Sequence, residues 1–308
     1  MIHFVARRLL LAAALVWLVV ILVFLALRIV PGDPARLVAG EGAGEEEVRA
    51  VRRAIGLDDP LLVQLVRFLG SALSGDLGTS LRSGRAVREE IARAFPVSLS
   101  LVGVGMLLSG GIGVAGGVLS AVVAGSAVDR VLTGAAAVAA SAPAFLTGTV
   151  LLVWFAGKLR WFPAGGFQSA WHLALPVATL VVSEGAVLLR VARGAAADVV
   201  CSEFVRTAVA KGLGPVRVLC RHVLPNVLVP VLALCVADFG RLLGGAVVIE
   251  SLFALPGMGY MALEAVRYRD YPLLQGVVVT LCAGAVLAGA VGDLVAALVD
   301  PRLRRGHS

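Results

Sequence analysis

Charged residues are scarce in this chain. Asp, Glu, Lys and Arg together make up 15% of its 308 residues, and hydrophobic residues make up 59%. An average soluble domain carries about 25% charged residues. The composition excludes an ordinary soluble domain and places the chain among membrane proteins with several spans. At roughly 20 apolar residues per helix, this length accommodates about six spans and one sizeable loop region.

Enzyme motifs are also lacking. No GxxxxGK[ST] phosphate loop occurs, so we do not expect the chain to bind ATP, and neither HExxH nor GxSxG is present. The four cysteines form no CxxC pair, and none stands at zinc-ligand spacing from a histidine. We therefore predict that the chain is not an enzyme and holds no catalytic residue, metal site or cofactor. Its net charge of +7 indicates basic cytoplasmic loops rather than nucleic-acid binding.

Apolar runs with little or no charge mark the predicted transmembrane helices. There are six, at residues 9–27, 97–128, 131–157, 173–189, 227–249 and 273–299. Asp129 and Arg130 form a tight turn between the second and third, and Pro143 is expected to kink the third. Arg7 and Arg8 precede the first run, and other arginines gather in short segments on the same side. The positive-inside rule then places both termini in the cytoplasm.

The predicted fold class is an all-α membrane protein with six transmembrane helices. It divides into an N-terminal segment with the first span, an extracytoplasmic helical cap, a core of five helices and a cytoplasmic tail, at residues 1–30, 31–96, 97–299 and 300–308. In the cap, Val48, Val51 and Ile55 fall on one face of a helix. A further short helix is expected to end at Pro96, because proline disrupts helix interiors.

A polar, basic segment separates the fourth and fifth apolar runs. This segment, residues 202–225, is called the basic elbow below. Glu203 is its one acidic residue, and its other charged residues are basic. Gly212 and a following Gly-Pro pair interrupt it. We predict two short helices joined by a turn at the cytoplasmic face, with Leu224 and Pro225 ending the second. A loop lying on anionic lipid would explain the charge but not the glycine and proline pattern. The elbow is therefore interpreted as a docking surface for a soluble cytoplasmic partner.

Three charged residues fall well inside predicted spans, whereas Asp293, near the end of the sixth, is expected to be an interfacial group. Glu184 lies in the fourth, and Asp238 and Arg241 lie three apart in the fifth. Such groups are expensive in a bilayer and are candidates for function by default. They form either structural ion pairs that fix helix packing or a polar patch on a translocation path, and both interpretations stay open.

The elbow resembles the signature of the permease subunits of binding-protein-dependent ABC importers, in the dipeptide, oligopeptide and nickel branch. That signature is EAA, three residues, Gly, nine residues and I-x-L-P. Its positions here hold Arg206-Thr207-Ala208, Gly212 and His222-Val223-Leu224-Pro225. Residues 203–212 follow the branch pattern (E)Y-x-R-T-A-x-A-K-G closely. Further branch-like motifs are Pro31-Gly32-Asp33-Pro34, Leu57-Asp58-Asp59-Pro60, Gly75-Asp76-Leu77-Gly78-Thr79-Ser80, Pro256-Gly257-Met258-Gly259, Arg269-Asp270-Tyr271-Pro272 and Asp300-Pro301-Arg302.

The resemblance implies an importer in the bacterial inner membrane. Its partners would be a second, similar permease, two ATP-binding subunits that bind and hydrolyse the ATP, and an extracytoplasmic substrate-binding protein. The substrate would be a peptide, nickel or a nickel chelate. The residues implied to couple the chain to an ATPase are Glu203, Arg206, Thr207, Ala208, Lys211, Gly212, Leu224 and Pro225.

One alternative is an ion-coupled secondary transporter that works through Asp238, Arg241 and Glu184. Such transporters often contain inverted repeats with broken helices near the bilayer midplane. The two halves of this sequence have no clear repeat between them, which favours the importer interpretation.

Overall fold

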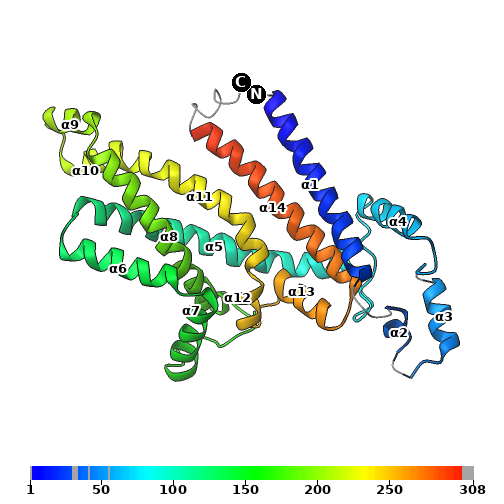
Figure 1. Ribbon diagram of the computed structural model, residues 1–308. Helices are drawn as coiled ribbons and strands as arrows, with labels where there is room; N and C mark the ends of the chain where they lie inside the picture. The colour runs from blue at the N-terminus through cyan, green and yellow to red at the C-terminus, as the bar shows by residue number, and fades with distance from the viewer. Residues whose placement is uncertain (1, 30–33, 41, 55, 300–308) are drawn as a thin grey trace. The chain divides into compact units, whose positions relative to one another are not determined.

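The computed structural model describes residues 2–29, 34–40, 42–54 and 56–299 (Figure 1). Over these residues every regular element is helical, apart from one isolated antiparallel bridge between Thr79 and Ala86. The helices form two compact units. The first holds α1–α4, the start of α5, α13 and most of α14, and the second holds the rest of α5 through α12 and the end of α14. The motif residues 31–33 and 300–302 and the tail 300–308 lie outside the described part.

The first unit begins with four helices. They are α1 (Ile2–Ile29), α2 (Pro34–Ala39), α3 (Glu45–Ala54) and α4 (Leu61–Leu73). Helix α3 is amphipathic, as predicted, with Val48 buried. Its first turn is acidic and its last turn basic, which complements the helix dipole. Helices α1 and α4 pack through Phe24 and Phe68, whose ring centroids lie 5.6 Å apart.

Helix α5 (Val87–Val122) has 36 residues and passes through Pro96 without a break. The prediction that a short helix ends at Pro96 was therefore wrong, and the predicted boundary of the cap falls inside a helix. The reason is packing before the proline. Val87, Ile91 and Ala94 are buried in one cluster with Met258 and Val277, which holds this face in helical register. The contacts of this buried face outweigh the local cost of the proline.

The second unit contains the broken helix that Pro143 predicted. Helix α6 (Ala127–Ser141) ends before Pro143, and α7 (Ala144–Leu151) continues as a π-helical segment, η1 (Leu152–Lys158). The two parts are bent by 105°. Ala142 has an extended backbone, as expected for a residue that precedes proline.

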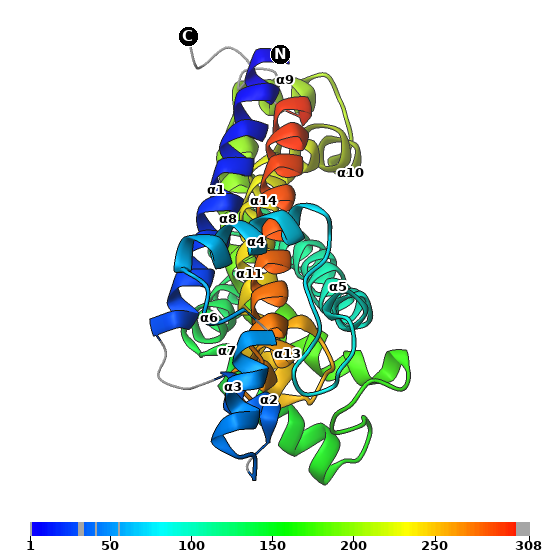
Figure 2. The same ribbon diagram turned by 90° about the vertical axis from the view of Figure 1, so that its right-hand side faces the viewer.

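The remaining elements lead from the middle of the chain to its end. They are η2 (Ala170–Leu173), α8 (Ala174–Val200), α9 (Glu203–Ala210), α10 (Pro215–Val218), η3 (Leu219–Val223), α11 (Leu224–Gly245), α12 (Val247–Leu252), α13 (Met258–Arg267) and α14 (Tyr271–Val299). Helix α8 packs against α6, α7 and α11, which makes it the central helix of the second unit. Helices α9 and α10 lie at the far end of α8, where the basic elbow was predicted (Figure 2).

Four described helices are long and apolar enough to cross a membrane. They are Val87–Val122, Ala170–Val200, Pro215–Gly245 and Tyr271–Gly292, and the bent pair around Pro143 makes a fifth if it counts as one span. In α1 the described apolar stretch is the shorter Ala13–Ala26. The all-helical membrane class is confirmed at the level of four or five spans, and the count of six and the orientation of the termini stay predictions.

Candidate functional site

The basic elbow begins with helix α9, which is amphipathic. Val205 and Ala208 are buried, and α9 contacts both α8 and α10. The outer face is open: Phe204 and Val209, at its edges beside the buried residues, are exposed apolar residues, and Arg206 makes a solvent-exposed ion pair with Glu203, at 3.1 Å. An isolated exposed pair of this kind adds little stability. The outer face therefore combines positive charge with apolar surface, a composition that suits protein contact.

The turn after α9 depends on Gly212. Its φ is +80°, in the left-handed region that favours glycine. The Gly212 amide donates to the Val209 carbonyl at 2.9 Å, and the Leu213 amide donates to the Ala208 carbonyl at 3.3 Å. These two bonds define a Schellman motif, which satisfies carbonyls at the end of a helix. A Cβ at this position would meet no atom within 4 Å, so the requirement for glycine is conformational and not steric.

The second half of the elbow differs from the prediction. Helix α10 begins at Pro215, a favoured first helical residue, and runs through η3 directly into α11. Leu224 and Pro225 therefore do not end the elbow but lie in the first turn of α11. The π-helical geometry of η3 explains how the helix passes Pro225. Proline has no N–H to donate, and the wider turn before it tolerates the missing hydrogen bond. The side-chain amide of Asn226 also donates, through Nδ2, to the His222 carbonyl at 2.7 Å.

The predicted coupling residues lie together in this elbow. Glu203, Arg206, Thr207 and Ala208 are on α9, and Lys211 and Gly212 form the turn. Five of these six residues are exposed, and Ala208 is buried. The basic side chains of Arg217 and Arg221, on the second half, are exposed as well.

Glu184, Asp238 and Arg241 form a charged triad between α8 and α11. The Arg241 Nε donates to Asp238 at 2.9 Å, and its Nη2 donates to Glu184 at 3.1 Å. The carboxylates are largely covered, with 14% and 22% of the side chains of Glu184 and Asp238 exposed, whereas 59% of Arg241 is exposed. The spacing of Asp238 and Arg241 predicted their pairing. Glu184 was left without a partner in the sequence, because its partner lies 57 residues later.

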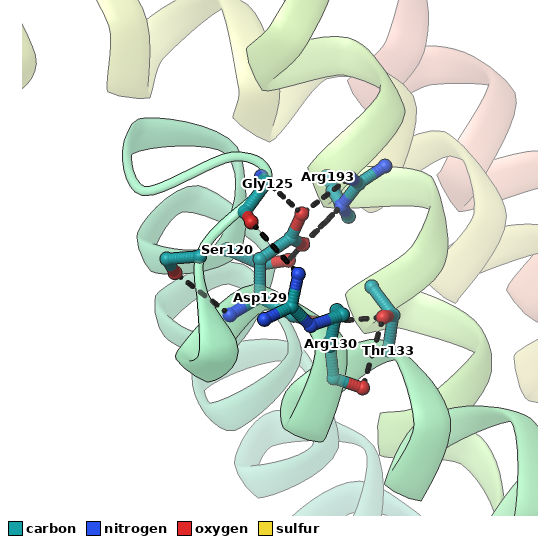
Figure 3. Close-up of polar contacts among 7 residues, drawn as sticks. Ser120, Gly125, Asp129, Arg130, Thr133 and Arg193 are labelled. Carbon is teal, nitrogen blue, oxygen red and sulfur yellow. Dashed lines mark hydrogen bonds and ion pairs between the residues drawn. The ribbon is translucent and has the colours of Figure 1, made fainter.

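A second charged group on α8 was missed by the sequence analysis. The carboxylate of Asp129, at the start of α6, accepts from Arg193 Nε at 2.8 Å and from Arg193 Nη2 at 2.9 Å (Figure 3). It also accepts from the Ser120 hydroxyl and, at 2.9 Å, from the Gly125 amide. We call these four residues the Asp129 clamp. The only signal in the sequence was a lone aspartate between two uncharged runs, which was assigned to a turn.

In the first unit, two of the branch-like motifs meet at Asp270. This buried carboxylate accepts from the Ser80 hydroxyl and from the amides of Arg82 and Leu273, at 3.3 and 3.2 Å. Arg82 also donates to Glu264 at 2.9 Å. The motifs that end at Ser80 and begin at Arg269 thus have a common structural role, the joining of the segment before α5 to the segment before α14.

No group of three or more His, Cys, Asp or Glu side chains within the described residues is arranged to hold a metal ion. All four cysteines are free thiols: Cys201, Cys220, Cys235 and Cys282. The geometry is that of a helical membrane protein with an exposed basic elbow and ionic links between helices.

Known proteins align with this chain over nearly its whole length. Residues 113–305 match the family described as "Binding-protein-dependent transport system inner membrane component", and residues 1–102 match the corresponding N-terminal family. A probable peptide ABC transporter permease protein, y4tP of Sinorhizobium fredii, is 38% identical over 98% of this chain and 99% of its own length. The glutathione transport system permease protein GsiC of Escherichia coli K12 is 36% identical over 99% of each chain.

A solved structure shares the fold. A chain of the MetNI methionine ABC transporter, in an inward-facing conformation, superposes with a TM-score of 0.58 at 18% identity, over 68% of this chain and 96% of that one. The family matches, the full-length relatives and this fold lead to one conclusion. The chain belongs to the family of inner-membrane components of binding-protein-dependent transport systems, the membrane permeases of ABC importers.

Proposed function

We propose that this permease forms half of a translocation pathway for peptides. It would work with a second permease, two ATP-binding subunits and an extracytoplasmic binding protein that delivers the substrate. Two relatives that align over nearly the whole chain support peptides over nickel, since one carries the name of a peptide permease and the other that of a permease for glutathione, itself a small peptide.

The proposed topology has six spans with both termini in the cytoplasm. The first span would be α1, because its 28 residues extend about 42 Å at 1.5 Å per residue, more than the roughly 30 Å of the hydrocarbon core. The others would be α5, the bent pair around Pro143, α8, the run from Pro215 to Gly245, and α14. Arg7 and Arg8 at the start of α1 agree with a cytoplasmic N-terminus.

In this proposal the basic elbow docks on an ATP-binding subunit and transmits its movement to the membrane helices. One observation carries the idea: the elbow is joined to both neighbouring spans almost without a linker. Only Cys201 and Ser202 separate α8 from α9, and no break separates α10 from α11. A partner shifts a conformational equilibrium only when it binds the two states differently. A stiff elbow joined directly to two spans lets such differential binding act on both.

The charged triad would line the pathway. Arg241 is held by two carboxylates yet keeps more than half of its side chain exposed. A guanidinium in a span is costly unless it is paired or hydrated. Since a peptide carries a charge at each end, a site with both signs of charge suits it better than an apolar wall.

The elbow proposal is tested by comparing two glycine substitutions. Gly212→Asp places a negative charge in the basic elbow, at a φ of +80° that favours glycine, whereas Gly214→Ala changes a glycine whose φ of −64° suits any residue. Co-purification of the ATP-binding subunits with the permease pair is the measurement. We expect Gly212→Asp to lose most of the bound ATPase and Gly214→Ala to retain it. Equal retention by both variants, with transport intact, would contradict the elbow proposal.

A further inference from the structure

The Asp129 clamp is fully bonded. One carboxylate oxygen of Asp129 accepts from Arg193 and Ser120, and the other accepts from Arg193 and Gly125. Only 7% of the Asp129 side chain is exposed. Buried ion pairs are weak evidence for stability and are better attested as devices that fix one arrangement of elements. The clamp fixes three elements: the end of α5, the start of α6 and the C-terminal third of α8.

The same three elements are in close contact next to the clamp. Helices α5 and α8 approach so closely at Gly117 that a Cβ there would lie 2.6 Å from the Leu189 carbonyl oxygen and 2.6 Å from the Cβ of Ala192. One turn earlier, a Cβ on Gly113 would lie 2.7 Å from the Cβ of Leu188. Small residues allow this kind of helix packing. Helix α6 packs on a neighbouring part of α8, where Ala136 contacts Ala186 and Leu189.

The clamp also lies on the route from the elbow into the spans. Arg193 lies seven residues before Val200, the last residue of α8, which is about 10 Å along the helix. Any displacement of α9 enters α8 near Val200 and meets the clamp within three turns. A bond that joins α8 to α5 and α6 at this level determines whether α8 moves alone or carries the two helices with it.

We propose that Asp129 and Arg193 are positioning residues that make α5, α6 and α8 move as one body. The movement that the elbow receives then reaches α5 and α6 as well as α8. The inference rests on the proposed docking of the elbow to an ATP-binding subunit. Ser120 and Gly125 orient the Asp129 carboxylate, so the paired charges cannot simply be exchanged: an arginine at position 129 would leave both donors without an acceptor.

The test measures the distance between α6 and α8 in the complete complex. Spin labels are placed on cysteines introduced at exposed Val131 and Val200, after the native cysteines are replaced. The interspin distance is measured with and without Mg²⁺ and a non-hydrolysable ATP analogue. In the parent complex we expect the same distance in both states. In Arg193→Gln we expect a nucleotide-dependent shift and at least about a fivefold loss of substrate imported per ATP, the lower end of typical coupling between sites.

Arg190→Gln is the matched control. It removes the same charge from an exposed position one turn earlier on α8, so the parent behaviour is expected. Arg193→Lys keeps the charge but not the two parallel bonds, and we expect it to restore the constant distance only in part. A role confined to stability would lower the yield of assembled complex without a nucleotide-dependent distance.

Two outcomes separate this inference from the proposal beneath it. If Arg193→Gln binds the ATP-binding subunits, keeps the α6–α8 distance constant and imports normally, the clamp proposal is overturned and the elbow proposal stands. If Gly212→Asp binds the ATP-binding subunits as well as the parent does, the elbow proposal fails, and the route through the clamp fails with it.

Discussion

Helix α8 carries two ionic links that differ in burial and in bonding. Toward α5 and α6, in the clamp, 36% of the Arg193 side chain and 7% of the Asp129 side chain are exposed, and both oxygens of Asp129 accept hydrogen bonds. Toward α11, Arg241 joins Glu184 and Asp238 but keeps 59% of its side chain exposed. The more buried link suits a fixed contact, because both oxygens of Asp129 have partners. The exposed link leaves a guanidinium available to another molecule, which is the property that a pathway group needs.

We propose that the two sides of α8 have different functions. On one side of α8, small residues and the clamp bring backbones into contact, and on the other side charged side chains bridge α8 and α11. An importer that alternates between two states needs rigid parts and a contact that changes. The clamp supplies the first, and we place the changing contact at the charged triad.

The largest expected effect comes from forcing α5 away from α8. Gly117→Val places atoms within 2.7 Å of the backbone at Leu189 and Arg193, which cannot move aside as a flexible side chain would. We expect a loss of about 3 kcal/mol of stability, the upper end of ordinary overpacking, and a lower thermal midpoint of the purified complex. Gly111→Val is the control on the same helix, since its Cβ meets nothing within 4 Å. Equal midpoints for the two variants would contradict the close α5–α8 contact.

The next effect in size comes from breaking the clamp while keeping its shape. Asp129→Asn removes the charge opposite Arg193 and leaves a cation in a place that was built for a pair. We expect less substrate imported per ATP with most of the complex still assembled, as measured by parallel uptake and hydrolysis assays. Asp198→Asn, at an exposed site on α8, is expected to change neither. A similar decline in both variants would show that the lost charge matters and its position does not.

The triad should respond in a different kinetic parameter. Arg241→Lys keeps the positive charge but loses the planar group that bonds Asp238 and Glu184 together. We expect the substrate concentration for half-maximal uptake to rise, with assembly and basal ATP hydrolysis nearly unchanged, because lysine keeps a positive charge opposite the two carboxylates. A fall in assembly with unchanged half-saturation would instead make the triad a packing contact.

The smallest effect is expected from uncharged substitutions at the turn of the elbow. Gly212→Ala adds only a methyl group into open space, so the cost is the left-handed backbone, about 1–2 kcal/mol. Gly212→Asn should cost less, because asparagine tolerates this conformation better. The amount of bound ATPase is predicted to rise from the alanine variant to the asparagine variant to the parent glycine. The reverse order would contradict the backbone explanation.

The features that depend on neighbouring residues in the chain could be predicted from the sequence. The elbow followed from glycine, proline and one-signed charge, and the Gly212 turn, the amphipathic α3 and the break at Pro143 are all present. Three prolines gave three different results, however. Pro143 breaks a helix, Pro96 lies within one whose preceding face is buried, and Pro225 follows a π turn.

The ionic links show the other limit of sequence reasoning. The partner of Asp129 lies 64 residues later and that of Glu184 lies 57 residues later. Only the packing of α8 against its neighbours brings these side chains together. No spacing rule within one helix could have paired them.

The most direct test of the account is uptake by proteoliposomes that contain this chain, its partner permease and the two ATP-binding subunits. The probe is a labelled dipeptide, with the binding protein supplied outside. The account predicts uptake that requires both ATP and the binding protein and that is lost in Gly212→Asp. Uptake by this chain alone, without ATP and abolished by a protonophore, would contradict it and would favour an ion-coupled transporter working through Arg241.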